Sequence, residues 1–266
     1  MLRLREVPEL SEETTDTLAE LQAEVDAASG YAAQTEAAKA RWQSTSKATA
    51  AFVEVKEKLV AMCSGHRRCA YCEDSVADEI EHFRPKDLYP DYVFRWENYL
   101  YSCGPCNSPK SNHFAVLESD DPELTDVTRA RRDTIVPPPP GEPAFLDPRV
   151  DDPLDFLVLD IVDTFTFRAR PRISARKKLR ANYTIEELHL NDRAYLVEGR
   201  KTSYYSLLYA LDAAAMHKSR GEDLDGPKCV IEGTPHRCVW EEMKRQAKKL
   251  PLLISRFNAV PEVLDW

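Results

Sequence analysis

The apolar and polar positions of the first 62 residues follow helical spacing. Ser11, followed by two glutamates, has the features of a helix start, and this helix is expected to run to about Ser29 and Gly30. A second long helix is expected to end just before Cys69. Its apolar positions repeat at helical spacing and predict a face packed on the core: Phe52, Val55, Leu59 and Met62. Region 1–62 is therefore predicted to be helical.

A break in this pattern separates the two halves of the chain. Residues 129–143 are predicted to be a linker, because four consecutive prolines and Gly141 cannot continue a helix or lie inside a sheet. Beyond them, residues 156–162 and 164–167 are β-rich. With Asp163 near a turn, these two segments predict a short hairpin.

Helical patterns return after the hairpin. Thr184 is expected to cap a short helix through Glu187, and Asn191 to start a longer helix through Met216. A final helix fits residues 237–249. The chain is therefore predicted to be α+β and predominantly helical. It divides into an N-terminal helical region, a cysteine-rich element, a linker and a C-terminal hairpin with helices, at 1–62, 63–128, 129–143 and 144–266.

The composition is that of an ordinary globular protein. The chain has 266 residues, of which 43% are apolar and 30% are charged, and these figures argue against disorder and coiled-coil rods. The first ten residues lack the apolar core of a signal peptide, and no stretch approaches the roughly 20 apolar residues that span a bilayer. We therefore expect a cytoplasmic protein without a membrane partner.

The charge is unevenly distributed. The net charge is -9, yet residues 161–201 are net positive and residues 115–160 are strongly acidic. The densest basic run, from Arg168 to Arg180, holds seven basic residues and no acidic ones. Such a run is either a solvated face or a surface that binds phosphates, and the second interpretation needs another motif that calls for a polyanion.

Four of the seven cysteines form two CxxC pairs, with 30 residues between them: Cys69, Cys72, Cys103 and Cys106. One such pair alone is equally typical of a redox site. Two pairs framing a compact segment of a cytosolic chain favour four thiolates around one structural Zn²⁺ ion. The remaining cysteines lack this spacing and are interpreted as core or surface residues: Cys63, Cys229 and Cys238.

The segments framed by these pairs resemble the HNH nuclease family, which has the ββα-metal fold. The segments are EIEHFRPK at 79–86, WEN at 96–98 and CNSPK at 106–110. The three signature residues of the family fall on His82, Asn98 and Asn107. The separation of Asn98 from Asn107, with a lysine three residues further on, is similar to that in the HNH domain of RNA-guided CRISPR nucleases. This resemblance covers about residues 66–114.

A longer resemblance is to the PtuB-type HNH proteins of Septu and related, retron-associated anti-phage systems. It rests on the order CAYCE, IEHFRPK, FRWENYLYSCGPCN, a Leu-Asp-Pro segment at 146–148, a β-rich stretch and TIEELHLN at 184–191. In those systems the nuclease subunit works with an ABC-type ATPase. The resemblance therefore implies a PtuA-like partner for this chain, besides a nucleic acid substrate.

The residues of the motif suit phosphodiester hydrolysis. His82 is the best general base, because an unperturbed imidazole pKa of about 6.5 leaves it largely neutral at cytoplasmic pH. Glu81 and the Asn107 amide are oxygen donors suited to a catalytic Mg²⁺ or Mn²⁺ ion, and the family resemblance implies the same roles. It also implies that Asn98 braces the loop carrying His82. Lys110, Arg84 and Lys86 are the predicted phosphate contacts.

Several alternatives remain beside these roles. Glu79 is the alternative to Glu81 as a metal ligand, and the glutamate is longer than the aspartate that many family members carry before the histidine. His113 lies close enough in sequence to compete as a ligand. Asn98, which follows Trp-Glu, is also suited to capping a helix.

The resemblance thus implies a zinc-stapled ββα-metal element between N- and C-terminal helices. It further implies a metal-dependent endonuclease, with DNA favoured over RNA. The rival class is a catalytically silent zinc-binding module that binds nucleic acid or protein. An obligate subunit, docking on a controlling partner through the acidic segment 115–160, is compatible with the nuclease interpretation.

Overall fold

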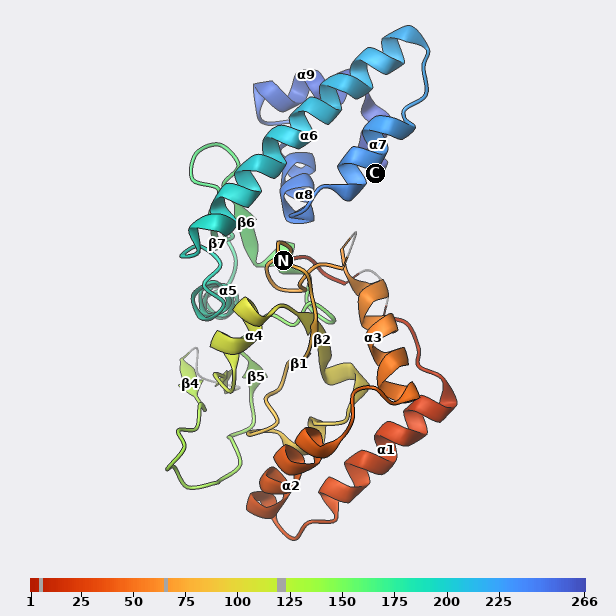
Figure 1. Ribbon diagram of the computed structural model, residues 1–266. Coiled ribbons are helices and arrows are strands. Elements are labelled where there is room, and N and C mark those ends of the chain that lie inside the picture. The colour runs from red at the N-terminus through yellow and green to blue at the C-terminus, as the bar shows by residue number, and fades with distance from the viewer. Residues whose placement is uncertain (5–6, 65–66, 119–122) are drawn as a thin grey trace.

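The computed structural model describes residues 1–4, 7–64, 67–118 and 123–266. About half of the chain is helical, and the strands are short and form small sheets. Figure 1 shows helices gathered at both ends of an elongated molecule, with the strands between them. This arrangement matches the predicted α+β, predominantly helical class.

The described part of region 1–62 contains three helices where the sequence predicted two. They are α1 (Glu12–Asp26), α2 (Tyr31–Ser44) and α3 (Ala50–Met62). Ser11 caps α1 as predicted, accepting a hydrogen bond from the Thr14 N–H. The helix ends at Asp26, and Gly30, at φ 86°, begins α2 instead of ending α1. The alanine-rich α2 has no continuous apolar stripe to reveal it, whereas the predicted stripe of α3 is fully buried.

A hairpin followed by a helix occupies the centre of the molecule. Strands β1 (Glu79–His82) and β2 (Tyr99–Ser102) pair antiparallel, with His82 opposite Tyr99. Helix α4 (Gly104–Lys110) begins directly after β2. The long connection between the strands contains two single-turn 3₁₀ helices, at Pro90–Tyr92 and Trp96–Asn98.

The second sheet uses the end of the predicted linker. Its strand order is β4–β3–β5, with β3 at Ala115–Leu117, β4 at Leu124–Asp126 and β5 at Glu142–Pro143. A side chain at Gly141 would come within 2.8 Å of the Leu117 carbonyl oxygen. The glycine therefore permits the close approach to β3, and the last two residues of 129–143 form a strand.

The predicted hairpin between residues 156 and 167 is confirmed, with a longer turn. Strand β6 (Leu157–Leu159) pairs antiparallel with β7 (Phe167–Ala169). Asp163 lies in the turn, as predicted, and Asp160 organises it, because its carboxylate accepts hydrogen bonds from the Val162 and Asp163 N–H groups.

The C-terminal region is helical, with different helix ends from those predicted. The helices are α5 (Ala175–Glu187), α6 (Ala194–Arg220), α7 (Asp225–Gly233), α8 (Arg237–Gln246) and α9 (Pro251–Ala259). Ser174 caps α5, while Thr184 lies within it and accepts a hydrogen bond from the Leu146 N–H at 2.9 Å. Asn191 starts no helix, because its amide pairs with the Phe167 backbone. Helix α8 is the predicted final segment, and α7 and α9 were not predicted.

One cluster of buried apolar side chains connects all the regions. It contains Leu18 of α1, Phe52 of α3, Leu100 of β2, Leu207 of α6 and Trp240 of α8. Strand β2 packs against α3, and the same core continues into the C-terminal helices, so the central hairpin is not an appendage. None of the helices in the described ranges has the length and apolar character needed to cross a bilayer.

Candidate metal centre and catalytic cavity

The four predicted zinc ligands meet in one buried cluster. The sulfur atoms of Cys69, Cys72, Cys103 and Cys106 all lie within 4.8 Å of one another. Each pair sits in a tight turn. The Cys69 carbonyl accepts from the Glu73 N–H, and the Cys103 carbonyl accepts from the Cys106 and Asn107 N–H groups.

The spacing of the sulfurs fits a zinc ion. Tetrahedral coordination with Zn–S bonds of about 2.3 Å places neighbouring sulfurs about 3.8 Å apart. The Cys72 and Cys103 sulfurs are 3.8 Å apart. Because all four cysteines are buried and no other ligand type enters the set, the cluster is suited to a closed structural site.

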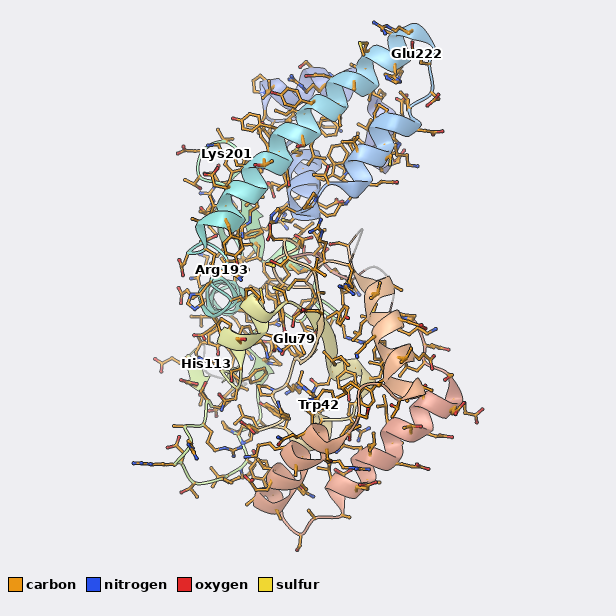
Figure 2. All side chains as sticks on the ribbon, viewed as in Figure 1. Trp42, Glu79, His113, Arg193, Lys201 and Glu222 are labelled. Carbon is orange, nitrogen blue, oxygen red and sulfur yellow. The ribbon has the colours of Figure 1, made fainter. Side chains whose placement is uncertain are left out.

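Side chains from the C-terminal region support this cluster. The Arg193 guanidinium, just before α6, donates to the Cys106 sulfur at 3.2 Å and to the Pro105 carbonyl at 3.1 Å. Next to the turn that contains Cys69 and Cys72, His236 Nε2 lies 3.1 Å from the carboxylate of Asp74. Figure 2 shows Arg193 at the start of α6, beside α4. Hydrogen bonds to a thiolate tune its charge and fix its position.

His82, at the end of β1, is buried in an aromatic setting. Its Nε2 atom lies 2.9 Å from the Val93 carbonyl oxygen. A carbonyl only accepts, so Nε2 carries the hydrogen and Nδ1 has a free lone pair. The Trp42 ring contacts the imidazole edge-to-face with centroids 4.2 Å apart. Burial, and then the charge of Lys86, lower the pKa of His82 to about 3, which keeps the ring neutral.

A polar cavity of about 260 Å³ opens beside His82. Residues of α2, β1, the following loop and α4 line it together. They are Trp42, Ile80, Glu81, His82, Pro85, Lys86, Asp87, Asn107, Ser108, Ser111 and Asn112. The cavity therefore brings together four predicted site residues: Glu81, His82, Lys86 and Asn107.

Glu81 and Lys110 form a buried ion pair. The Lys110 ammonium lies 2.5 Å from the Glu81 carboxylate, and both side chains are almost fully buried. The same ammonium donates to the His82 and Phe83 carbonyls, each at 3.1 Å. An ammonium has three donors, so none remains for a phosphate. Lys110 thus anchors the end of β1 to α4, a different position from the predicted phosphate contact.

Asn107 contacts Glu79 and not Glu81. Its amide nitrogen donates to the Glu79 carboxylate at 2.5 Å, which leaves the amide oxygen as an acceptor. Glu79 and Glu81 share one face of β1, because side chains alternate along a strand. The alternative ligand His113 lies 3.1 Å from Glu187 and is not among the cavity residues. In Figure 2 Glu79 lies near the centre of the molecule and His113 towards the side.

Asn98 ties together the loop that follows His82. Its amide nitrogen donates to the carbonyls of Arg84 and Tyr92, and its amide oxygen accepts from the Arg84 N–H at 2.7 Å. These contacts are the ones that a bracing role requires. The Arg84 guanidinium itself packs over the rings of Tyr89 and Tyr92.

Two curated proteins match parts of this chain. Septu protein PtuB of Bacillus thuringiensis is 41% identical over 66 residues, which cover 23% of this chain and 26% of that protein. Septu protein PtuB of Bacillus mycoides (strain KBAB4) is 34% identical over 121 residues, which cover 39% of this chain and 37% of that protein.

These two matches support membership of the PtuB-type family. The matched part spans between about a quarter and little more than a third of each relative's length. No family model matches the chain.

The basic run from Arg168 to Arg180 is partly neutralised. Arg176 and Arg180 both pair with Glu142, and Arg180 also pairs with Asp151. Arg170 lies 3.4 Å from an Asp155 carboxylate oxygen. Three of the seven basic side chains in this run are therefore paired with carboxylates, and two of these three hold β5 and the adjoining loop in place. The pairing leaves less positive charge available for a polyanion.

Sequence reasoning missed the part of the cavity that lies outside the motif. Trp42 is distant in sequence from β1, and it packs on His82 only because α2 folds back over the hairpin. Lys47 lies over the same indole ring, at 3.9 Å from its centroid. No spacing in the sequence signals either contact, because both depend on how distant elements pack.

Proposed function

We propose that this PtuB-type chain is an HNH metal-dependent endonuclease that hydrolyses phosphodiester bonds of nucleic acid, with DNA favoured over RNA. The observation that carries the proposal is the state of His82. Its imidazole, with Nε2 held by the Val93 carbonyl and Nδ1 left as an acceptor, lines a polar cavity that Glu81 and Asn107 also line. This is the arrangement that a general base needs.

The order of the elements adds support. His82 ends the first strand of the hairpin, Asn98 directly precedes the second, and Asn107 lies in the helix that follows. The HNH signature occupies the same three places in the ββα-metal fold. The four-cysteine cluster then ties the helix of this element to the segment before its first strand.

The proposed reaction assigns separate roles to these residues. His82 Nδ1 takes a proton from water as the resulting hydroxide attacks phosphorus. The bond from phosphorus to the leaving strand oxygen breaks, and that oxygen takes a proton from solvent. Mg²⁺ or Mn²⁺, held by Glu81 and Asn107 or by Glu79 in place of Glu81, would stabilise charge on the phosphate oxygens. Arg84 and Lys86 supply positive charge for the strand.

A purified, zinc-loaded chain tests this proposal. Supercoiled plasmid, single-stranded DNA and total tRNA are incubated with Mg²⁺ or Mn²⁺, beside the variant His82→Ala. The matched control is His217→Ala, which removes a histidine at the far end of α6. We expect cleavage by wild type and control, and none by His82→Ala or with EDTA while bound zinc is still measured. Cleavage by His82→Ala would contradict the role of this base.

One observation favours a catalytically silent zinc module as the second candidate. The Glu81 carboxylate is already paired with Lys110, so binding a metal ion has to compete with that ion pair. The same assay separates the two candidates. A folded, zinc-loaded chain that binds nucleic acid but cuts no substrate, alone or with its partner, supports the silent module.

We extend the proposal to a role in Septu anti-phage defence, with an ABC-type ATPase that controls the nuclease in the cytoplasm. The support is the similarity to the two Septu proteins PtuB. Coexpression with an ABC-type ATPase of a Septu system, followed by size-exclusion chromatography, tests the partner. Co-elution and a change in cleavage on adding ATP are expected, and separate elution would contradict the partner.

A further inference from the structure

Three lysines at or near the cavity form no ion pair among the described residues, although Lys86 interacts electrostatically with the Glu81 carboxylate that Lys110 already pairs. Lys47 follows α2, Lys56 lies in α3 and Lys86 follows β1. Uncompensated positive charges that gather in one place repel one another, and such clusters are typical of sites that bind anions.

A continuous set of contacts connects these lysines to His82. The Lys56 ammonium donates to the Lys47 carbonyl at 3.0 Å. The Lys47 ammonium lies over the Trp42 ring, and that ring packs on the His82 imidazole. Lys86 lines the same cavity as Trp42 and His82. Lys86 therefore lies at the proposed reaction centre itself, whereas Lys47 and Lys56 are connected to it through Trp42.

Lys47 is held in position and still has one donor available. Its ammonium donates to the carbonyls of Trp42 and Thr45, at 2.8 and 2.7 Å, at the end of α2. Two of its three donors are thereby used. The third forms no hydrogen bond among the described residues, and the ammonium also lies over the Phe52 ring, 4.9 Å from its centroid. Burial, and then the charges of Lys56 and Lys86, lower the pKa of Lys47 to about 8. An anion bound between these lysines would relieve the repulsion that this shift reflects.

We propose that Lys47 and Lys86 bind backbone phosphates of the nucleic acid strand that enters the His82 cavity, with Lys56 adding positive charge behind them. The N-terminal helices thus form part of the nucleic-acid interface, besides packing on the hairpin. This inference rests on the proposed function, because it places the bound strand at the same centre.

The test measures binding without cleavage. The fluorescence anisotropy of a labelled 20-nucleotide single strand is followed against salt concentration, with zinc-loaded protein and no added Mg²⁺ or Mn²⁺. Lys47→Gln/Lys86→Gln is compared with Lys248→Gln/Lys249→Gln, which removes two exposed lysines just beyond α8. Each phosphate contact on a single strand contributes about 0.7 to the slope of log affinity against log salt.

We expect the slope to fall by about 1.4 in Lys47→Gln/Lys86→Gln, which corresponds to about 25-fold weaker binding at 0.1 M salt. The control should bind like wild type. Lys47→Arg, which keeps the charge, should retain most of the affinity. Lys86→Gln alone should lower the slope by about half as much as Lys47→Gln/Lys86→Gln does. Zinc content and the thermal midpoint show that each variant is folded.

Three results would overturn the inference. They are an unchanged slope in Lys47→Gln/Lys86→Gln, an equal loss in the control, and the absence of binding by wild type. Binding that depends on both lysines without any cleavage would contradict the nuclease and leave this site in place. If wild type cleaves nucleic acid and its affinity for the labelled strand does not depend on these lysines, the nuclease is supported and this binding site is contradicted.

Discussion

The four-cysteine cluster and the His82 cavity share one short helix, α4, but they are assembled in different ways. The cluster consists of two local turns, each of which presents two sulfurs within four residues. The cavity draws its walls from α2, β1, the loop after β1 and α4. A site built from local turns depends mainly on residue spacing, whereas a site built from distant elements depends on the packing of the whole N-terminal half.

The two sites also differ in charge. Four thiolates concentrate negative charge at the start of α4, where Arg193 donates to Cys106. The cavity has lysines near it, and its one buried carboxylate, Glu81, is already paired with Lys110. The first site is therefore suited to a cation, and the lysines near the second are suited to a polyanion, with α4 connecting the two sites.

The largest expected effect comes from breaking the cluster. Cys106→Ser removes one thiolate, and we expect the purified variant to lose its zinc and to unfold at a midpoint lower by about 10 °C or more. Metal analysis and thermal unfolding measure both. Cys229→Ser, which replaces an exposed cysteine outside the cluster, is the matched control and should behave like wild type. Full zinc content in Cys106→Ser would contradict a four-thiolate site.

Breaking the link between the two sites should have the next largest effect. Lys110→Met leaves the Glu81 carboxylate buried without its partner, and we expect a loss of about 3–5 kcal/mol in the free energy of unfolding. Lys110→Met/Glu81→Gln removes the unpaired charge as well and should recover part of that loss. Urea titrations measure both variants. A double variant as unstable as the single one would show that the ion pair is not the source of the stability.

The next effect concerns the wall of the cavity outside the motif. Trp42→Ala removes the ring that positions His82, and we expect turnover to fall about 10- to 100-fold, because small displacements of a catalytic group are costly. Strand affinity should fall much less, and Trp42→Phe should retain most of the turnover. Single-turnover cleavage and anisotropy measure the two quantities separately. Equal losses in both would indicate that Trp42 acts on binding instead of on the base.

The smallest expected effect is a dependence of stability on pH. Burial lowers the pKa of folded His82 to about 3, whereas an unfolded histidine titrates near its ordinary value, so the unfolded chain binds the extra proton. Stability is therefore fully present above about pH 6.5 and is lost as the pH falls toward 3, at about 1.4 kcal/mol per unit. Wild type should lose about 2 kcal/mol more than His82→Gln between pH 7.5 and 5. Equal losses in urea titrations would show that His82 is not the group responsible.

The sequence predicts the local features well and the distant contacts poorly. The cysteine quartet follows from CxxC spacing, and the apolar stripe of α3 follows from helical spacing. Lys110 shows the limit of this reasoning. A lysine near the end of a short polar helix is typical of a surface, and its burial depends on α4 packing across β1.

The missed helix ends have a similar cause. Thr184 and Asn191 are good helix caps by residue type, but their side chains bind the backbone of Leu146 and Phe167 instead. Helix α9 begins at a proline and α7 contains one, so neither has the continuous pattern that would reveal a helix. Tertiary hydrogen bonds and packing decide these cases, and a single sequence does not display them.

The construction of α4 has a consequence for how the protein matures. A helix of seven residues with an internal proline is too short to persist by itself. Cys103 and Cys106 fix its start in the four-cysteine cluster, and Lys110 fixes its end to Glu81 of β1. We therefore expect the helix to depend on both of these attachments. Newly made chains would therefore complete the His82 cavity only after acquiring their metal.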